Sequence, residues 1–431
     1  MKVATCMVVC LGLWASAAWC AEPAARIAGP YDADPRHPWN QLHEALFVRT
    51  APTGERYGSS ELDPLFWENT RHLLTSPSHE QALRVLDRFL RSQAERLVHD
   101  PLKRALLQRD LWSLFDWSAD PRNESDSQAR GELQRRLAAL IRQLALAPVE
   151  IDRLPDNLSN EPSLEGAGLQ DVLRGDGAWV LVGRPGDFAA QEHRQGFGGR
   201  SVFLVFVQFP GGREAALKYL KDLREFAPAL VYPVYPRDVA AGLAALRDPR
   251  RLVTNDQTLQ FPAGTQWALV RRMCLIDSLG NIRVSPIVES IQVRRYISIP
   301  APKAPFEALR DSQEEAEIQM DRERPPHLRA IQPGDRDFQF VQFRSMGWDP
   351  LENVSPEKWK ESLGRFRGET LATCRQCHMA RGILSVNSYS HFGMEANALE
   401  ASTLEREARA TIAWKLRQFD WGRLTGLWLA Q

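Results

Sequence analysis

One five-residue motif near the C-terminus constrains this chain more than any other feature. Cys374 and Cys377 lie three positions apart, and His378 follows the second cysteine directly. With 6 cysteines and 9 histidines among 431 residues, random placement would produce this pattern on the order of 0.002 times. The motif therefore indicates a specific chemical site, and the rest of the chain must fold around that site.

The spacing C-x-x-C-H is the one at which haem c is attached covalently to a protein. The thiols of Cys374 and Cys377, on one helical turn, can each add to a vinyl group of the same porphyrin. His378 can then present a ring nitrogen to the iron as the proximal ligand. The sequence thus predicts one covalent haem and three residues that hold it.

Two interpretations without haem use the same residues. A zinc site would need four ligands, and the chain has no second C-x-x-C pair to complete one. A dithiol redox pair is expected at a strand-to-helix junction of a thioredoxin-like unit. Residues 337–380 are predicted to run from strand to helix, but the remainder of that pattern is missing. Haem is the favoured prediction.

The N-terminus has the pattern of a secretory signal, predicted over residues 1–21. Lys2 precedes the apolar run 3–14, and small residues follow at 15–18. Cys20 offers a lipid anchor as the alternative, although the bulky Trp19 precedes it. No later stretch approaches the ~20 apolar residues that span a bilayer. We expect a periplasmic or otherwise exported protein, which agrees with haem attachment after export.

Composition limits the range of partners. Lys+Arg and Asp+Glu balance at 54 each, so no net field would attract nucleic acid, and no nucleic-acid role is expected. An unidentified redox partner protein is expected instead. Cys274 lies in an apolar run, which predicts a buried small hydrophobic residue rather than a reactive thiol.

The predicted fold class is α+β, in three parts after the signal. Residues 40–152 are expected to form a helical domain, with helices beginning near Pro77, Pro101 and Asp126. Residues 346–431 form the haem-bearing segment, with helices from Pro356 and over 404–419. The apolar face expected for 404–419 consists of Ala408, Ile412, Leu416 and Phe419.

The central part, residues 165–345, is predicted to be an α+β domain with an antiparallel or mixed sheet. The expected elements are strands at 178–182, 201–209 and 337–344, a helix at 213–226 and a hairpin of 267–277 with 282–296. Strand, helix and strand in this order suggest a ferredoxin-like arrangement. The Pro-rich, charged stretch 300–336 is expected to be a linker or long loop.

The sequence says less about which residue would bind the second axial position of the iron. Met394 and His391 follow the motif after an irregular stretch and are the first candidates, whereas Met379 is too close to reach the far face. Met346 and Met320 are more distant candidates. If the position is open, a polar distal residue would be required, and the candidates for that role are His193, Arg271, Arg272 and Arg294.

The motif resembles the haem-attachment site of c-type cytochromes. The resemblance covers about ten residues around Cys374, Cys377 and His378, and it implies electron transfer or haem-based redox chemistry. The C-terminal placement is also similar to that in cytochromes c-prime and in lysine-crosslinked haem enzymes of ammonia oxidisers. A haem enzyme or small-molecule sensor with an open distal site is therefore the alternative, and no crosslinking lysine is identified.

Overall fold

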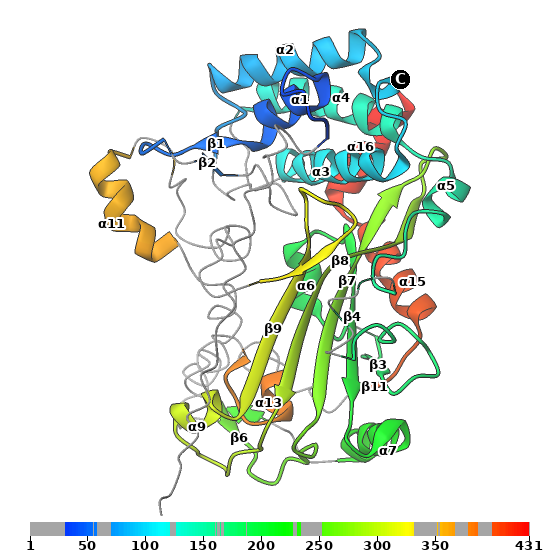
Figure 1. The fold of residues 1–431 in the computed structure, drawn as a ribbon, viewed down its shortest axis with the longest axis vertical. Helices are drawn as coiled ribbons and strands as arrows, with labels where there is room; N and C mark the ends of the chain where they lie inside the picture. The colour runs from blue at the N-terminus through cyan, green and yellow to red at the C-terminus, as the bar shows by residue number, and fades with distance from the viewer. Residues whose placement is uncertain are drawn as a thin grey trace, which may run out of the picture.

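A seven-stranded antiparallel sheet forms the centre of the computed structural model (Figure 1). Its strand order is β10-β9-β8-β7-β4-β3-β11. The strands are β3 (Val180–Gly183), β4 (Ser201–Gln208), β7 (Gln266–Ile276), β8 (Ile282–Tyr296), β9 (Gln313–Met320), β10 (Leu328–Ala330) and β11 (Glu400–Ala401). The structure describes residues 31–54, 56–57, 70–120, 126–159, 161, 164, 168–186, 188–226, 231–233, 252–331, 351, 354–366, 378–386 and 399–430.

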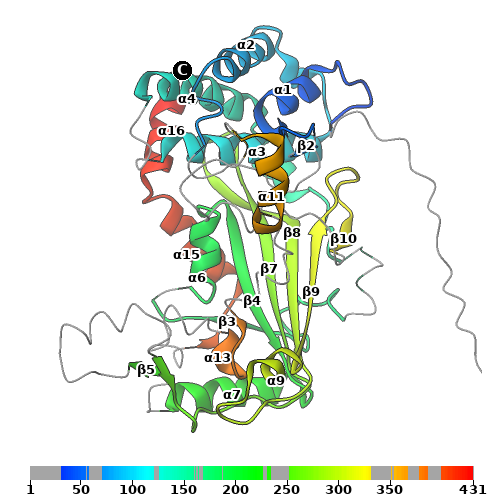
Figure 2. The same ribbon diagram turned by 90° about the vertical axis from the view of Figure 1, so that its left-hand side faces the viewer.

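Helices gather at one end of this sheet (Figures 1 and 2). They are α1 (Pro38–Phe47), α2 (Ser78–Arg91), α3 (Pro101–Ala119), α4 (Ser127–Leu144) and α16 (Phe419–Leu429). The three predicted N-terminal helices are therefore confirmed. The Asp100 side chain accepts a hydrogen bond from the Leu102 amide at 2.9 Å and so caps the start of α3.

Asp126, near which the third of these helices was predicted to begin, does not cap it through its side chain. Asp126 precedes α4, but its side chain makes no capping hydrogen bond and its φ is +68°. Its carboxylate instead accepts a hydrogen bond from Arg71 at 2.7 Å. The prediction of where the helix begins is confirmed, and the Asp126 carboxylate forms an ion pair with Arg71.

Helix α3 is buried on nearly every side, because it lies between α4, α16 and β7. Gln108 joins it to the sheet through its side-chain amide. Its Nε2 donates to the Ile276 carbonyl at 2.7 Å, and its Oε1 accepts from the Ile276 amide at 3.1 Å. A single hydrophobic core continues from the helices through the sheet to α16. The fold is α+β, as predicted, and the division at residues 152 and 165 stays a prediction.

The central hairpin of β7 and β8 is confirmed. Asp277 Oδ1 accepts hydrogen bonds from the amides of Leu279 at 3.0 Å and Asn281 at 2.8 Å, which closes the turn. Gly280 has a φ of +83°, a conformation that favours glycine.

Two predictions about the central region are wrong. The stretch 300–336 is not a loop throughout, because it contains α9 (Phe306–Arg310), β9 and β10. The ferredoxin-like arrangement also fails. After β4 and α7 (Gly212–Glu225), the strand β5 (Val231–Pro233) pairs with β6 (Leu252–Thr254) in a separate sheet.

The remaining described elements are short or peripheral. They are β1 (Arg49–Thr50), β2 (Arg56–Tyr57), η1 (Ala94–Arg96), α5 (Pro148–Asp152), α6 (Gln191–Gly196), α11 (Pro356–Phe366), α13 (Ile383–Val386) and α15 (Leu404–Lys415). The predicted helices from Pro356 and from 404 are confirmed. The predicted signal at 1–21, with Cys20, and the strand at 337–344 lie outside the described residues.

The apolar face predicted for α15 is only partly right. Ala408 and Ile412 pack against the core, but Leu416 and Phe419 are exposed. The fully buried line of α15 consists of Glu407, Thr411 and Lys415. These side chains lie four positions apart, so they share one face of the helix, and this polar face is turned inward.

The two faces of β8 and β9 differ in chemistry. Residues directly opposite on neighbouring strands point to the same face. Ile291 lies opposite Ile318 and belongs to the hydrophobic core. The other face carries the opposed pairs Gln292 with Glu317, Arg294 with Glu315, and Tyr296 with Gln313. This polar face of β8 and β9, although largely buried, is where the motif histidine lies.

Candidate functional site

His378 is the one residue of the C-x-x-C-H motif that the structure describes, since Cys374 and Cys377 lie outside the described residues. Its Nδ1 lies 2.6 Å from the backbone carbonyl oxygen of Ser385. A carbonyl oxygen can only accept, so Nδ1 carries the hydrogen in this contact. Nε2 then keeps its lone pair and is the nitrogen available to a metal.

The electrostatic setting keeps this imidazole neutral. Burial is the main cause that lowers the pKa of His378 well below its usual 6.5, and the charges of Arg294 and His193 lower it further. The hydrogen bond to Ser385 opposes the shift without reversing it. A histidine that ligates a metal must be neutral, so the site holds His378 in the state that ligation requires.

The segment 378–386 is fixed to the sheet by its own side chains. The Ser385 hydroxyl donates to the Gly382 carbonyl at 2.8 Å and also contacts the Tyr296 hydroxyl. Ile383 and Leu384 are almost fully buried in a second apolar cluster with Trp267 and other core residues. The carbonyl that orients His378 is therefore part of a packed unit.

Two further hydrogen bonds attach this segment to the chain around it. Arg381 Nε donates to the Pro300 carbonyl at 2.8 Å, and Gln313 Nε2 donates to the His378 carbonyl at 3.4 Å. Gly382 has a φ of +49°, and a Cβ there would collide with the Gln260 side chain. The positive φ at this position is the conformation that favours glycine.

His193, one of the distal candidates from the sequence, lies across from His378. It belongs to α6, a short helix beside β4. The two imidazole centroids are 6.3 Å apart, and the ring planes differ by 24°. His193 also contacts Phe203, with ring centroids 5.7 Å apart. The structure therefore brings two histidines together that are far apart in the sequence.

The other predicted distal residues divide into two groups. Arg294 lies near His378 but is paired with Glu315 at 2.7 Å. Arg271, Arg272 and Met320 make their contacts with other residues. Arg271 pairs with Glu289 at 2.9 Å, Arg272 donates to the Ser285 carbonyl at 2.8 Å, and Met320 belongs to the apolar core on the opposite face. Met346, His391 and Met394 lie outside the described residues.

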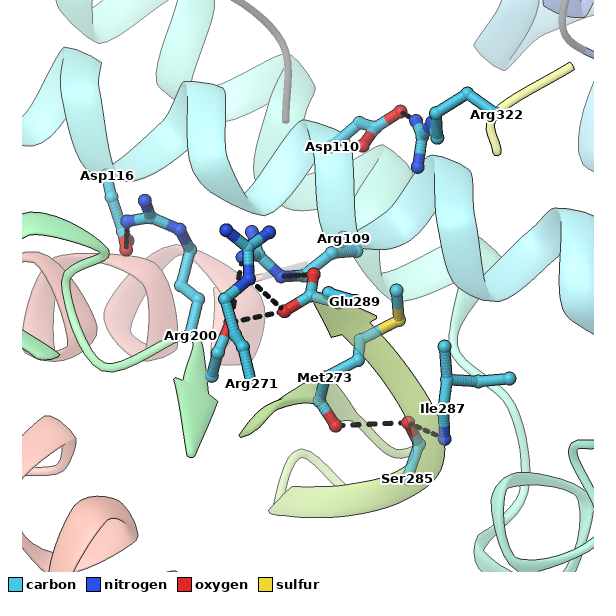
Figure 3. Close-up of polar contacts among 11 residues, drawn as sticks. Arg109, Asp110, Asp116, Arg200, Arg271, Met273, Ser285, Ile287, Glu289 and Arg322 are labelled. Carbon is cyan, nitrogen blue, oxygen red and sulfur yellow. Dashed lines mark hydrogen bonds and ion pairs between the residues drawn. The ribbon is translucent and has the colours of Figure 1, made fainter. Parts of the chain in front are cut away.

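Sequence reasoning missed the extent of buried charge between the sheet and helix α3 (Figure 3). Glu289 is 1% exposed and contacts both Arg271 and Arg109 of α3, the latter at 3.3 Å. The Ser201 hydroxyl donates to the same carboxylate at 2.5 Å. The signal was present in the sequence, because charged residues interrupt the apolar alternation of 282–296.

A second buried cluster joins α3 to the C-terminal helices. Asp116 Oδ2 accepts from Lys415 at 2.6 Å and from Arg200 at 2.7 Å, and Lys415 also contacts Asp420. Burial alone would raise the pKa of Asp116, but the charges of Lys415 and Arg200 lower it below its usual value. The pKa of Asp420 is raised to about 6, first by burial and then by Asp116.

Within the described part of the chain, no group of three or more His, Cys, Asp or Glu side chains is arranged to hold a metal ion. Haem iron needs fewer protein ligands than a bare metal ion, because the porphyrin supplies four nitrogens and the protein supplies only the axial ligands. The imidazole of His378, whose Nδ1 donates to Ser385, has the donor chemistry that a haem iron takes at Nε2.

Comparisons with protein-family models, curated proteins and solved structures gave no match. Among the helices that the structure describes, none is long and apolar enough to cross a membrane. The function must therefore be argued from the motif and from the geometry around His378.

Proposed function

We propose that this protein is an exported monohaem c-type protein that transfers electrons or performs redox chemistry at its haem. Cys374 and Cys377 would form the thioether bonds, and His378 would be the proximal ligand. The observation that carries the proposal is the 2.6 Å contact between His378 Nδ1 and the Ser385 carbonyl. Histidines that ligate metals commonly donate their second ring N–H to such an acceptor, which fixes ring orientation and tautomer.

The residues around His378 suit this role. Haem, when bound, supplies one-electron redox chemistry. Burial, together with the charges of Arg294 and His193, holds the pKa of the imidazole well below its usual value, which favours the neutral form. The Ser385 carbonyl polarises the ring and makes Nε2 a stronger donor, while Tyr296 and Gly382 keep Ser385 in place. A protein adjusts the redox potential of haem iron in this way, by orienting the ligating histidine and by hydrogen-bonding its second ring nitrogen.

The proposal is tested by expressing the full chain in a bacterial host with a c-type haem maturation system. We expect haem absorbance that survives acid–acetone extraction, with sharp bands after reduction by dithionite. Cys374→Ala and Cys377→Ala should each remove one thioether bond, and the double variant should lose covalent haem. Cys274→Ala is the matched control, because it removes a buried thiol outside the motif and should keep the haem.

Wild-type protein without haem absorbance under these conditions would contradict the proposal. Bound zinc, or a thiol pair that cycles with a disulfide, would then favour one of the two interpretations without haem.

A haem enzyme or sensor with an open iron position is the second candidate function. The observation that favours it is the buried charge close to His378, where Arg294 and Glu315 form an ion pair on the polar face of β8 and β9. Of this pair, the Arg294 guanidinium can donate hydrogen bonds to a small molecule on iron. A high-spin spectrum that shifts with carbon monoxide or peroxide would identify this function.

A further inference from the structure

We propose that the buried ion pair of Arg294 and Glu315 sets the reduction potential of the haem, with Arg294 favouring the reduced iron and Glu315 limiting that effect. This inference rests on the proposed function, because it requires a haem on His378. It gives a role to two residues on the polar face of β8 and β9 that do not belong to the C-x-x-C-H motif.

The ion pair is buried and well aligned. Arg294 on β8 lies directly opposite Glu315 on β9, so both side chains point to the same face of the sheet. Arg294 Nη1 donates to Glu315 Oε1 at 2.7 Å, and the two side chains are only 10% and 2% exposed. Charges that are shielded from water and salt in this way act on groups several ångströms away.

A glutamine connects this ion pair to the segment that carries His378. Gln313 lies two residues before Glu315 on β9, and its Oε1 accepts a long hydrogen bond from Arg294 Nη1 at 3.5 Å. Its Nε2 donates to the His378 carbonyl at 3.4 Å and lies 3.8 Å from the sulfur of Met379. Arg294 is therefore one side chain away from the motif histidine, and the effect of its charge on the pKa of His378 agrees with this short separation.

The direction of the effect follows from the charge of the iron. Oxidation adds one positive charge at the haem, so a nearby cation raises the energy of the oxidised form and a nearby anion lowers it. Arg294 alone would therefore raise the reduction potential, and Glu315 alone would lower it. Arg294 is the member of the pair whose charge acts on His378, so the pair as a whole should raise the potential.

The pairing also explains how a positive charge can be kept in this place. A buried cation without its partner is strongly destabilising, so Arg294 needs the carboxylate of Glu315 beside it. Salt screens buried charges much less than exposed ones, so the effect on the potential should persist at high ionic strength. A charge that acts in this way needs no small molecule on the iron. Of the two functions above, electron transfer is then the one favoured.

The test compares reduction potentials of the haem-loaded full chain, measured by redox titration of the haem spectrum. A unit charge about 10 Å from the iron, at an effective dielectric constant of about 20, changes the reduction equilibrium about tenfold or more. Glu315→Gln should therefore raise the potential by about 59 mV or more for one electron. Arg294→Gln should lower it by a similar amount. The double variant should lie between Arg294→Gln and wild type, and Glu315→Asp, which keeps the charge, should stay close to wild type.

The controls separate this inference from the proposed function. Arg295 and Glu314 form the neighbouring pair on the opposite face, with both side chains 61% exposed, and Arg295→Gln and Glu314→Gln should leave the potential unchanged. Wild-type potentials in Arg294→Gln and Glu315→Gln, or shifts in the same direction, would overturn the inference while the proposed function stands. If neither single variant folds, a double variant with the wild-type potential would overturn it as well. Wild type without covalent haem would instead reject the proposed function, and the inference with it.

Discussion

At the scale of single residues, the buried carboxylate of Glu289 joins helix α3 to the sheet. It contacts two guanidinium groups, those of Arg109 and Arg271, and all three side chains are at most 4% exposed. Burying charges is costly unless they are paired, and removing one member of such a group costs more than the group contributes. We therefore expect the protein to tolerate little change at this residue.

Glu289→Gln keeps the shape of the side chain and removes its charge. Because two buried cations lose the carboxylate that they share, we expect the free energy of unfolding to fall by about 3 kcal/mol or more. Urea denaturation followed by circular dichroism would measure the shift in midpoint.

The matched control is Glu314→Gln, the same substitution in an ion pair with Arg295 whose side chains are both 61% exposed. An exposed pair contributes little, about 0–1 kcal/mol. Equal effects of the two substitutions would show that burial does not set the cost.

His378 shows how far residue-level prediction reached. The three motif positions follow from covalent chemistry, which is local and visible in the sequence. The Ser385 carbonyl as the acceptor of Nδ1 was not predicted, because a backbone oxygen carries no sequence signal. His193 was named only as a weak candidate, since no local pattern reveals that α6 approaches the motif.

At the scale of elements, prediction succeeded where hydrophobic periodicity was strong. The helices α2, α3 and α4 and the β7–β8 hairpin were expected within a few residues of their bounds. The apolar residues of α2 and α4 recur at the helical period, Asp100 caps α3, and Asp277 closes the hairpin turn.

Prediction failed where an element buries polar residues. Strand β9 places Gln313, Glu315 and Glu317 on its polar face, so its sequence has the composition of an exposed loop. Helix α15 likewise buries Glu407 and Lys415. Composition cannot distinguish a solvated charge from one whose partner comes from a distant strand or helix, and these partners are tertiary contacts.

The junction of α15, α16 and α3 gives a pH-dependent prediction. The pKa of Asp420 is raised to about 6, so the folded state binds its proton more tightly than the unfolded state does. Stability from this group is complete below about pH 4 and is lost as the pH rises through about 6. Relative to Asp420→Asn, wild type should therefore lose up to about 3 kcal/mol of unfolding free energy over this interval.

Urea denaturation of both proteins at several pH values between 4 and 7 would measure this difference. Asp176→Asn is the control, because the Asp176 side chain is 82% exposed, and its stability curve should run parallel to that of wild type. A difference between wild type and Asp420→Asn that does not change with pH would refute the assignment.

At the scale of the whole molecule, the C-terminal helix lies beside the N-terminal helices. The C-terminal helix α16 packs on α3 and α4, next to the helices that begin the described chain (Figures 1 and 2). Trp421, Leu424 and Trp428 belong to the same hydrophobic core as the N-terminal helices and the sheet. The candidate haem site lies further along the sheet, where Ile383 and Leu384 pack in the second apolar cluster.

This continuity leads to a prediction about cooperativity. Trp421 is 7% exposed and its ring lies 5.9 Å from that of Trp112. Trp421→Ala leaves a cavity in the core, which should lower the free energy of unfolding by about 3–5 kcal/mol. If the core is one unit, the amides of β7 and β8 should lose hydrogen-exchange protection together with those of α3 and α4.

Phe419→Ala is the control on the same helix, because Phe419 is 63% exposed and should change the stability by less than about 0.5 kcal/mol. Loss of protection confined to the helices would support the predicted helical domain of residues 40–152 as an independent unit. Loss that extends into the sheet would mean that the helices, the sheet and the C-terminal helix unfold together. The histidines on α6 and on segment 378–386 would then be held in place by one cooperative structure.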